Sequence, residues 1–546
     1  MMPPFFKRSK RKKKNPNEET NQNKTNASVY ESIDVSLSAN LDIIRKRTGN
    51  SPDVVFRELK IGRNPEVPIA IVYLEGLSDH KTINDFLIES IMQSKTLQEE
   101  LAQQDVFEIM KKQVIALGTV TVIHDWNELF SSLMSGQAII FIDGKGAALC
   151  TSTKGGEKRS IEEPSSQVTI RGPRDGFTES IQVNISLVRR RIQNPDLWVE
   201  SMKIGKVTKT TVSFMYINGI AKDEIVEEVR TRLKRINIDS ILESGYIEQL
   251  IEDQTLTTFP TTYNTERPDT VAGNLLEGRI AIFVDGTPFV LLVPALFIQF
   301  FQSVEDYYGR FDISTALRFL RILMFIISII APAVYIAATT FHQEMIPTPL
   351  IIAIAAQREA VPFPAFVEAL IMEVAFEILR EAGIRMPRAV GSAISVVGAL
   401  VVGQAAVEAG IVSAAMVIIV AITAIANFAT PSMAMAISAR LIRFLYMVAA
   451  ATFGFYGVIL AMIFQTVHLC SLRSFGVPYM SPLAPMIPSD NDDTIVRVPW
   501  WAFRTRPKLM TGENSIREGK NQKPKPPKNR GMVNTQQKEK GDSDDR

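Results

Sequence analysis

The feature that most constrains this chain of 546 residues is the confinement of its long apolar stretches to the C-terminal half. A helix that crosses a bilayer needs roughly 20 apolar residues, since each residue rises about 1.5 Å across a hydrocarbon core of about 30 Å. Residues 289–301 are apolar but short and contain Pro294, so they form either a fifth, broken span or an interfacial helix. We predict an all-α, polytopic membrane domain at 289–490, with spans at residues 322–340, 389–407, 411–428 and 444–467.

The N-terminal half contains two copies of one sequence unit. Residues 40–62 align with 184–205, 71–76 with 214–219, and 133–144 with 275–286, at an offset that stays between 142 and 144. A chance alignment would not hold this register over about a hundred residues. We therefore predict repeat units at 28–150 and 181–288, joined by a polar linker at 151–180. Matched positions include Asn40 with Asn184, Arg47 with Arg191, Pro52 and Asp53 with Pro195 and Asp196, and Gly62 with Gly205.

Each unit shows the same order of predicted elements. Short apolar runs of β-branched residues bounded by turn residues are typical of buried strands, and Asp-Gly supplies a tight turn. The predicted fold class is an α/β soluble N-terminal half made of two repeated units, followed by an all-α polytopic membrane domain. Because both Asp-Gly pairs match, we expect a structural role for them and not a catalytic one. The order is a charged helix, a strand that ends in Gly76 or Gly219, a helix at 78–93 or 222–235, and a strand that ends in Asp143-Gly144 or Asp285-Gly286.

The two ends of the chain have a polar composition. Residues 1–27 are basic and then rich in Asn, Thr and Glu, and we expect them to be disordered because they cannot bury a core. Their basic run, 7–14, is either a solvated tail or a segment that binds an anionic membrane surface. No apolar stretch follows it, so we predict no secretory signal, and we expect the N-terminal half to face the cytoplasm. Residues 491–546 are predicted to be a polar tail.

Charged residues near the apolar stretches indicate their orientation, because cytoplasmic loops carry an excess of Lys and Arg. The loop with Glu408 and no cation is predicted to be external. The segments with Arg385 and Arg388, with Arg440 and Arg443, and the C-terminal tail are predicted to be cytoplasmic. These side assignments and the number of predicted spans disagree by one crossing of the membrane. Either 348–380 crosses or re-enters the membrane, or 467–490 turns back.

An acidic helix follows residue 364. Pro362 and Pro364 must break any helix and mark a hinge. Acidic residues at membrane depth are costly and normally face a cavity or a partner. The alternatives are a water-filled pathway and an amphipathic helix on the membrane surface with its acids in water. The acids are Glu368, Glu373, Glu377 and Glu381, the last three on one helix face, and the candidate partners are Arg380, Arg385 and Arg388.

The next apolar stretch carries a line of small residues. One interpretation is close packing between helices. The other is the lining of a pore on an oligomer axis, with Gln404 and Glu408 setting polarity and charge at its mouth. The line consists of Gly391, Ser395, Gly398, Val402 and Ala405.

The sequence contains little that suggests catalysis or cofactor binding. Cys150 and Cys470 lack a metal-like spacing, and the four histidines are scattered. No phosphate-binding loop, nucleophile elbow or zinc-protease motif occurs. We therefore predict that the protein is not an enzyme and holds no metal or cofactor. With a formal net charge of +2, the composition does not favour a nucleic-acid partner.

Several longer motifs resemble the A subunits of GerA-type spore germination receptors over roughly residues 30–500. They are RGP at 171–173, NTERPD at 264–269, VDGTPFVLLVP at 284–294, REAVPFPAFVEALIMEV at 358–374, REAGIRMP at 380–387, GQAAVEAG at 403–410 and SFGVPYMSP at 474–482.

The resemblance implies a protein of the spore inner membrane, with its N-terminal domain in the spore core. It implies a transporter-like B subunit that binds the nutrient and a lipoprotein C subunit as partners. It also implies a homo-oligomeric ring that forms a nutrient-gated cation channel. The alternatives are a non-conducting scaffold and a secondary transporter. The apolar stretches show no repeat of the kind that transporters usually have, which counts against the transporter.

Overall fold

The computed structural model describes residues 32–62, 66–93, 106–111, 120–155, 163–164, 167, 169–385, 403–519 and 522–525. The chain divides into two compact units. One consists of Met1–Arg47 and Val54–Gly156, and the other of Thr48–Asp53 and Glu157–Arg546. The basic segment 1–27, predicted to be disordered, lies outside the described residues.

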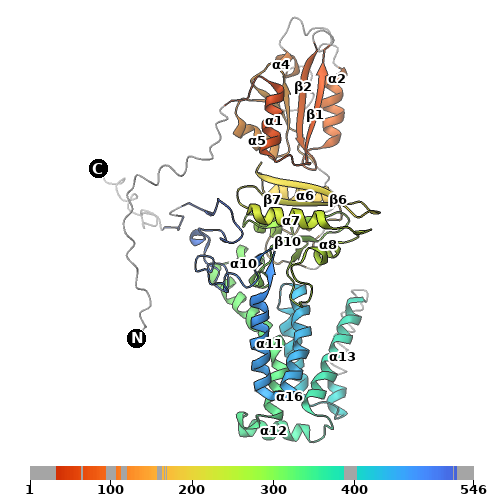
Figure 1. Cartoon of the computed structure of the whole chain (residues 1–546), viewed down its shortest axis with the longest axis vertical. Coiled ribbons are helices and arrows are strands. Elements are labelled where there is room, and N and C mark those ends of the chain that lie inside the picture. The colour runs from red at the N-terminus through yellow and green to blue at the C-terminus, as the bar shows by residue number, and fades with distance from the viewer. Residues whose placement is uncertain are drawn as a thin grey trace, which may run out of the picture. The chain divides into compact units, whose positions relative to one another are not determined.

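The first unit is an antiparallel five-stranded sheet with helices on both faces (Figure 1). Successive side chains of a strand point to opposite faces. Val72 of the second strand packs with Leu41 and Leu129, whereas Ile71 packs with Ile83 and Ile91 on the other face. The strands, in the order β1-β2-β4-β5-β3, are β1 (Val54–Ile61), β2 (Val67–Leu74), β3 (Val120–Ile123), β4 (Ala138–Ile142) and β5 (Ala148–Thr151). The helices are α1 (Leu37–Arg47), η1 (Thr82–Ile88), α2 (Glu89–Gln93), α4 (Val106–Ile109) and α5 (Trp126–Met134).

The second unit begins with the same fold, which confirms the predicted repeat. Its sheet has the order β6-β7-β9-β10-β8, element for element that of the first unit. The strands are β6 (Leu197–Ile204), β7 (Thr210–Ile217), β8 (Tyr263–Thr265), β9 (Ile280–Val284) and β10 (Val290–Val293). The helices are α6 (Ile181–Arg191), α7 (Asp223–Arg235), α8 (Ser244–Ile251) and α9 (Pro268–Leu275).

Matched polar residues have the same role in both repeats. The side chain of Asn40 accepts a hydrogen bond from the N–H of Asp34 (3.0 Å) and donates to its carbonyl (2.7 Å). Asn184 makes the same pair of bonds with Thr178, at 2.8 and 2.6 Å.

The Asp-Gly turns also have a structural role. The carboxylate of Asp143 accepts from the N–H of Leu37 (3.0 Å), and that of Asp285 accepts from the N–H of Ile181 (3.2 Å). Leu37 and Ile181 are the first residues of α1 and α6. Each aspartate thus satisfies an N–H that has no partner within its helix.

The remainder of the second unit is a bundle of helices. Two of them, α11 and α16, are long and apolar enough to cross a membrane. Figure 1 shows α12 lying across one end of the bundle. The helices are α10 (Glu305–Tyr308), α11 (Phe311–Thr340), α12 (Thr348–Arg358), α13 (Ala365–Arg385), α15 (Ala414–Phe428) and α16 (Met433–Ser471), and short 3₁₀ turns occur at η3 (Phe297–Phe301), η4 (Gln343–Met345) and η5 (Trp500–Ala502).

Helix α16 reverses its direction at Gly454, whose φ of 61° and ψ of −142° are not helical. The hydroxyl of Tyr446 donates to the side chain of Gln465 at 2.6 Å. In a straight helix these residues would be about 29 Å apart, at 1.5 Å per residue. Ser438 and His468 also approach neighbouring residues: Ser438 donates to the carbonyl of Thr258, and His468 lies 3.1 Å from the hydroxyl of Thr257.

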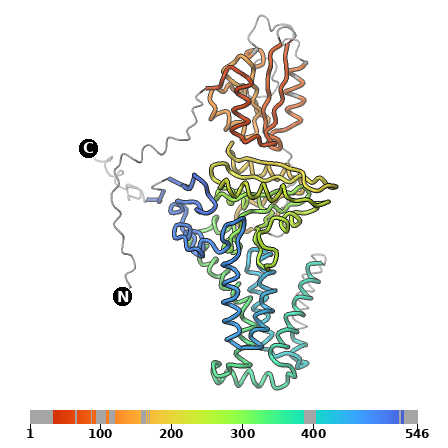
Figure 2. Tube along the Cα trace, viewed as in Figure 1, coloured from red at the N-terminus to blue at the C-terminus, as the bar shows by residue number. Residues whose placement is uncertain are grey.

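Helix α16 is therefore a hairpin of two arms, residues 433–453 and 455–471, which Figure 2 traces as neighbouring tubes. The single span predicted at 444–467 is wrong, because the reversal lies within it.

Two predicted boundaries of the membrane domain also differ from the structure. Residues 289–301 contain strand β10 and turn η3, and this apolar stretch packs in the core that the sheet shares with the helices. It is therefore not a span. At the other boundary, residues 472–490 include the small hairpin of β11 (Arg473–Ser474) and β12 (Val477–Pro478). The N–H of Phe297 bonds to the carbonyl of Tyr479 at 2.9 Å, so this segment packs against the sheet domain.

Candidate functional site: buried ion pairs in the helix bundle

Helix α13 begins directly after the predicted hinge. Helix α12 ends at Arg358 and α13 starts at Ala365, so Pro362 and Pro364 lie between two helices. Proline lacks an N–H and is tolerated in the first turn of a helix. The carbonyl of Pro364 accepts from the N–H groups of Val367 (2.9 Å) and Glu368 (3.2 Å), which fixes the start of α13.

Glu368 joins the starts of two helices. Its side chain is fully buried. One carboxylate oxygen accepts from the N–H of Ser413 at 3.0 Å, and the other lies 3.3 Å from Nε of Arg358. Ser413 is the N-cap residue of α15, and its own hydroxyl accepts from the N–H of Met416. Glu368 thus links α12, α13 and α15.

Glu373 forms an ion pair with Arg443, in the first arm of α16, and both residues are at most 2% exposed. The hydroxyl of Thr423 lies 3.4 Å from the carboxylate. Nε of Arg443 donates to the carbonyl of Ser328 at 2.6 Å. In a regular helix that carbonyl would accept from the residue four positions later, but here this residue is Pro332, which has no N–H. Arg443 therefore connects α13, α16 and the interrupted hydrogen bond of α11.

Glu377 forms the next ion pair, with Arg440. The two side chains are 29% and 18% exposed, so this pair lies nearer the surface of the bundle. The two glutamates are four positions apart and the two arginines are three positions apart, and these spacings put side chains on one helix face. The facing surfaces of α13 and the first arm of α16 therefore carry opposite charges.

Of the predicted partners, only Arg385 forms an ion pair with an acid of α13 among the described residues. Arg385 pairs with Glu381 at 2.7 Å in an exposed contact within the same helix. The guanidinium of Arg380 lies 5.3 Å from the ring centre of Phe428. Arg388 lies outside the described residues.

The burial of Glu368 and Glu373 contradicts the interpretation of α13 as a surface helix with all its acids in water.

The structure describes only the outer part of the candidate pore. Residues 403–408 are helical, and the side-chain amide of Gln404 donates to Glu408 at 2.8 Å in an exposed contact. The chain then turns at Gly410, which has a φ of 65° and lies beside the carbonyl of Ala360. The other predicted residues, Gly391, Ser395, Gly398 and Val402, lie outside the described residues.

A second charged cluster, at the start of α11, escaped the sequence interpretation. Arg318 is 1% exposed and pairs with Asp306 (2.9 Å) and Asp493 (2.7 Å). Asp493 also accepts from the hydroxyl of Tyr307 at 2.6 Å. Burial raises the pKa of Asp493 to about 6, although Arg318 and Tyr307 act in the opposite direction. The available signal was an arginine near the start of an apolar helix, but one of its two partners, Asp493, is 175 residues away.

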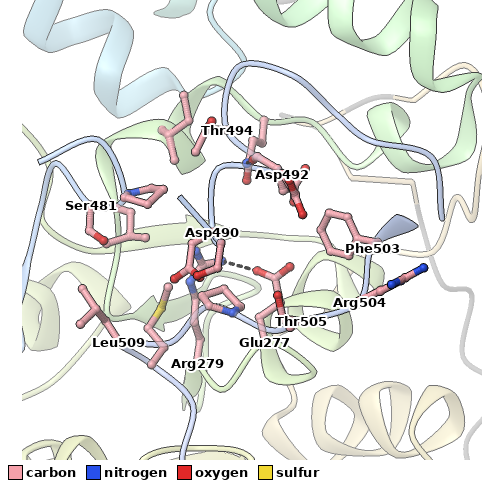
Figure 3. Close-up of a pocket in the computed structure, with 18 residues that line it drawn as sticks. Glu277, Arg279, Ser481, Asp490, Asp492, Thr494, Phe503, Arg504, Thr505 and Leu509 are labelled. Carbon is pink, nitrogen blue, oxygen red and sulfur yellow. Dashed lines mark hydrogen bonds and ion pairs between the residues drawn. The ribbon is translucent and has the colours of Figure 1, made fainter. Parts of the chain in front are cut away.

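Beside this cluster, the C-terminal segment and the turn before β9 enclose a small cavity of about 50 Å³. Figure 3 shows Glu277 and Arg279 from the turn facing Asp490 and Asp492 from the C-terminal segment. Glu277 and Arg279 pair at 3.3 Å. The cavity is too small for an organic ligand, and its charged lining indicates an interface between segments of the chain.

Comparison with known proteins shows relatives along most of the chain. Spore germination protein KA of Bacillus subtilis (strain 168) is 62% identical over 502 residues, which cover 92% of each chain. The uncharacterized membrane protein YfkQ of the same organism is 44% identical over 497 residues, covering 91% of this chain and 96% of that protein. Spore germination protein GerLA of Bacillus cereus is 40% identical over 475 residues, covering 87% and 96%.

A solved structure is also similar in sequence. It is the N-terminal domain of the A subunit of the Bacillus megaterium spore germinant receptor GerK3, which is 53% identical and matches with a TM-score of 0.41. The match covers 50% of this chain and all of that domain. A family model for the Bacillus/Clostridium GerA spore germination protein matches residues 42–509, and the chain belongs to this family.

Proposed function

We propose that the protein is the A subunit of a nutrient-responsive germination receptor in the spore inner membrane. In this proposal it assembles into a ring with copies of itself, and with a transporter-like B subunit and a lipoprotein C subunit. The ring forms a cation channel that opens when nutrient is bound. The family match supports the receptor role. The observation that supports a membrane switch is the set of ion pairs that join α13 to α12 and α16.

The ends of the helices support one arrangement in the membrane. The turn at Gly454 lies beside Phe341 and His342, and the turn at Gly410 lies beside Ala360. These turns therefore share the end of the bundle that is remote from the sheet. Ser438 and His468 contact Thr257 and Thr258 at the sheet end.

With the sheet on the cytoplasmic side, Arg440 and Arg443 lie toward the cytoplasm and Glu408 lies outside. This agrees with the excess of cationic residues expected on the cytoplasmic side. In this arrangement α13 crosses the membrane, and the two arms of α16 return the chain to its starting side. The conflict of one crossing in the sequence interpretation then disappears.

In this mechanism the ion pairs stabilise the closed state of the channel, and the small-residue stretch lines the pore. Removing one member of a buried pair leaves the other charge without compensation, which costs about 3–5 kcal/mol. A movement of α13 relative to α16 would separate Glu373 from Arg443 and Glu377 from Arg440, so the pairs favour one closed arrangement. Gly391, Ser395, Gly398 and Val402 are the proposed lining, and Gln404 and Glu408 the proposed outer mouth.

The test is cation conductance of the purified protein in planar bilayers, with and without its partner subunits and nutrient. We expect cation-selective openings that disappear or change in Gly398→Leu, because a bulky side chain would fill the space of a small one. The double variant Glu373→Gln and Glu377→Gln should change cation flux, because it weakens the ion pairs between α13 and α16. Silence of an intact complex with nutrient present would overturn the channel proposal.

A second candidate function is a non-conducting scaffold that relays the state of the nutrient-binding partner. The specific observation in its favour is that Glu368, Glu373 and Glu377 all find cationic partners within one chain. Such pairing is what a purely structural bundle would also show. Normal germination by a complex that never conducts would favour the scaffold.

A further inference from the structure

The first repeat is closed by the residues that directly follow its last hairpin. The N–H of Asp79 donates to the carbonyl of Thr153 at 2.9 Å, and the N–H of Gly155 donates to the carbonyl of Leu77 at 3.1 Å. Between them, Ser78 and Lys154 form an antiparallel bridge. Residues 153–155 therefore act as a short closing strand along the loop after β2.

The second repeat is closed in the same way, but by residues from the other end of the chain. The N–H of Lys222 donates to the carbonyl of Met510 at 3.2 Å, and the N–H of Gly512 donates to the carbonyl of Ile220 at 2.9 Å. Ala221 and Thr511 form the antiparallel bridge. The bonds match those of the first repeat residue for residue. The residues that directly follow β10 lead instead toward the helices.

The glycine that supports the closing strand is also matched. Gly136 and Gly278 both have positive φ, of 86° and 88°. A Cβ on Gly136 would lie 2.9 Å from the carbonyl oxygen of Leu77, and one on Gly278 would lie 2.8 Å from that of Met510. Both positions require glycine, because a backbone carbonyl passes directly over them, that of Leu77 in the first repeat and that of Met510 in the second.

Further contacts hold the C-terminal segment on both sides of Met510. Arg506 donates to the carbonyl of Leu276 at 2.8 Å, and Arg517 pairs with Glu277 at 2.9 Å. Met510 itself is 1% exposed. Earlier in the segment, Asp493 pairs with Arg318 of α11. The segment thus connects the end of α16, the start of α11 and the second repeat.

We propose that the second repeat carries a docking site for a short extended segment, and that residues 510–512 of the same chain, here named the closing strap, occupy it. The docked strap replaces the part that residues 153–155 supply in the first repeat. It also holds the end of the helix hairpin to the sheet domain, so the closure of the second repeat depends on residues that follow the helices. This proposal does not depend on ion conduction.

Cross-linking tests the docking directly. Ala221→Cys and Thr511→Cys are introduced into the full chain in membranes, with Cys150 and Cys470 replaced by serine. The two positions form a non-hydrogen-bonded pair of antiparallel strands. The Cα atoms of such a pair are about 4.5 Å apart, a separation that a disulfide can bridge. We expect an intramolecular disulfide on oxidation and none for Ala221→Cys with Gly519→Cys. A covalent dimer, or no disulfide, would overturn docking within one chain.

A matched pair of glycine variants tests whether the second repeat needs the strap. A Cβ on Gly512 would lie 3.3 Å from the carbonyl oxygen of Ala221, whereas one on Gly519 would meet only the end of the Gln522 side chain at 3.7 Å. We expect Gly512→Val to increase the rate of proteolysis within 181–293 several-fold and Gly519→Val to leave it unchanged. Equal protection of both variants would overturn the proposal.

Rescue by a peptide separates docking from general misfolding. A chain truncated after Pro507 should lose protection of the second repeat, and a synthetic peptide of residues 508–518 should restore it. The same peptide with Gly512→Val should not. Restoration by both peptides would contradict a specific site. If the truncated chain cannot be recovered from membranes, the two full-length glycine variants decide the question.

Discussion

Arg443 compensates for a hydrogen bond that Pro332 removes from a different helix. The carbonyl of Ser328 would be an unpaired polar group inside the bundle without the guanidinium of Arg443, and such groups cost about 1–3 kcal/mol. The same guanidinium neutralises Glu373. A single side chain therefore satisfies a buried charge and a backbone defect.

Replacing Glu373 with glutamine should leave the buried charge of Arg443 without its partner. We expect a loss of about 3–5 kcal/mol in stability, measured as a lower midpoint of thermal unfolding in detergent. The double variant Glu373→Gln and Arg443→Met should recover part of the loss, because it removes both charges.

The matched control is Glu381→Gln. Glu381 pairs with Arg385 in an exposed contact, and exposed pairs contribute only about 0–1 kcal/mol. Equal unfolding midpoints for Glu373→Gln and Glu381→Gln would contradict the importance of burial.

The sequence indicates the acids of α13 but not the arginines that pair with its buried glutamates. The spacing of charges along a helix indicates neighbours within that helix, which is why Arg385 was found for Glu381. Arg443 is 70 residues from Glu373, and only the packing of two helices brings them together. The roles of Asn184 and Asp285 are easier to predict from the sequence, because the repeat aligns each with a residue of the first unit that has the same local role.

At the scale of elements, the hairpin of α16 was missed because its residues form one continuous apolar run. Glycine is common in membrane helices, so Gly454 alone was a weak signal of a reversal. Strands β1 and β6 were missed for the opposite reason. They lie at the edges of their sheets and carry exposed charged residues such as Glu58 and Lys60, so they lack an apolar run.

The reversal of α16 can be tested with a cysteine pair. Tyr446→Cys with Gln465→Cys, in a chain whose own cysteines are replaced by serine, should be joined by a short bifunctional thiol reagent, because the ends of the two long native side chains touch. A continuous helix would hold these positions about 29 Å apart and prevent the cross-link.

Gly454→Val should reduce the yield of this cross-link, because a Cβ there would lie 2.8 Å from the ring of His342 and the φ of 61° disfavours any side chain. Gly403→Val is the control, since its Cβ would meet Val417 at an ordinary 3.5 Å.

At the scale of the whole second unit, the cluster of Arg318, Asp306 and Asp493 joins the C-terminal segment to the first long helix. Residues 491–546 are predicted from the sequence to be a polar tail, because they lack apolar runs. In the structure, residues 491–519 follow the surface of the sheet domain, held by arginine side chains and backbone hydrogen bonds. Such contacts leave no periodic pattern in the sequence.

The raised pKa of Asp493 predicts how pH affects this attachment. Its pKa is about 6 in the folded protein and 3.8 ordinarily, so between these values the folded state binds the proton more tightly. The cost of the ionised carboxylate is therefore fully present above pH 6 and disappears as the pH falls toward 4. Relative to Asp493→Asn, the unfolding midpoint of the parent protein should rise as the pH is lowered from 7 to 4. Parallel pH profiles for the two proteins would contradict this assignment.

The hairpin of α16 has a consequence for the synthesis of the protein. From residue 444 to residue 467 the chain carries no charged side chain, and the tip at Gly454 lies between Phe453 and Phe455. Moving a charge through hydrocarbon is costly, but this tip carries none. In the membrane arrangement proposed above, the two arms therefore enter the bilayer together as a pair, without translocating a hydrophilic loop, and the chain emerges on the side from which it was inserted.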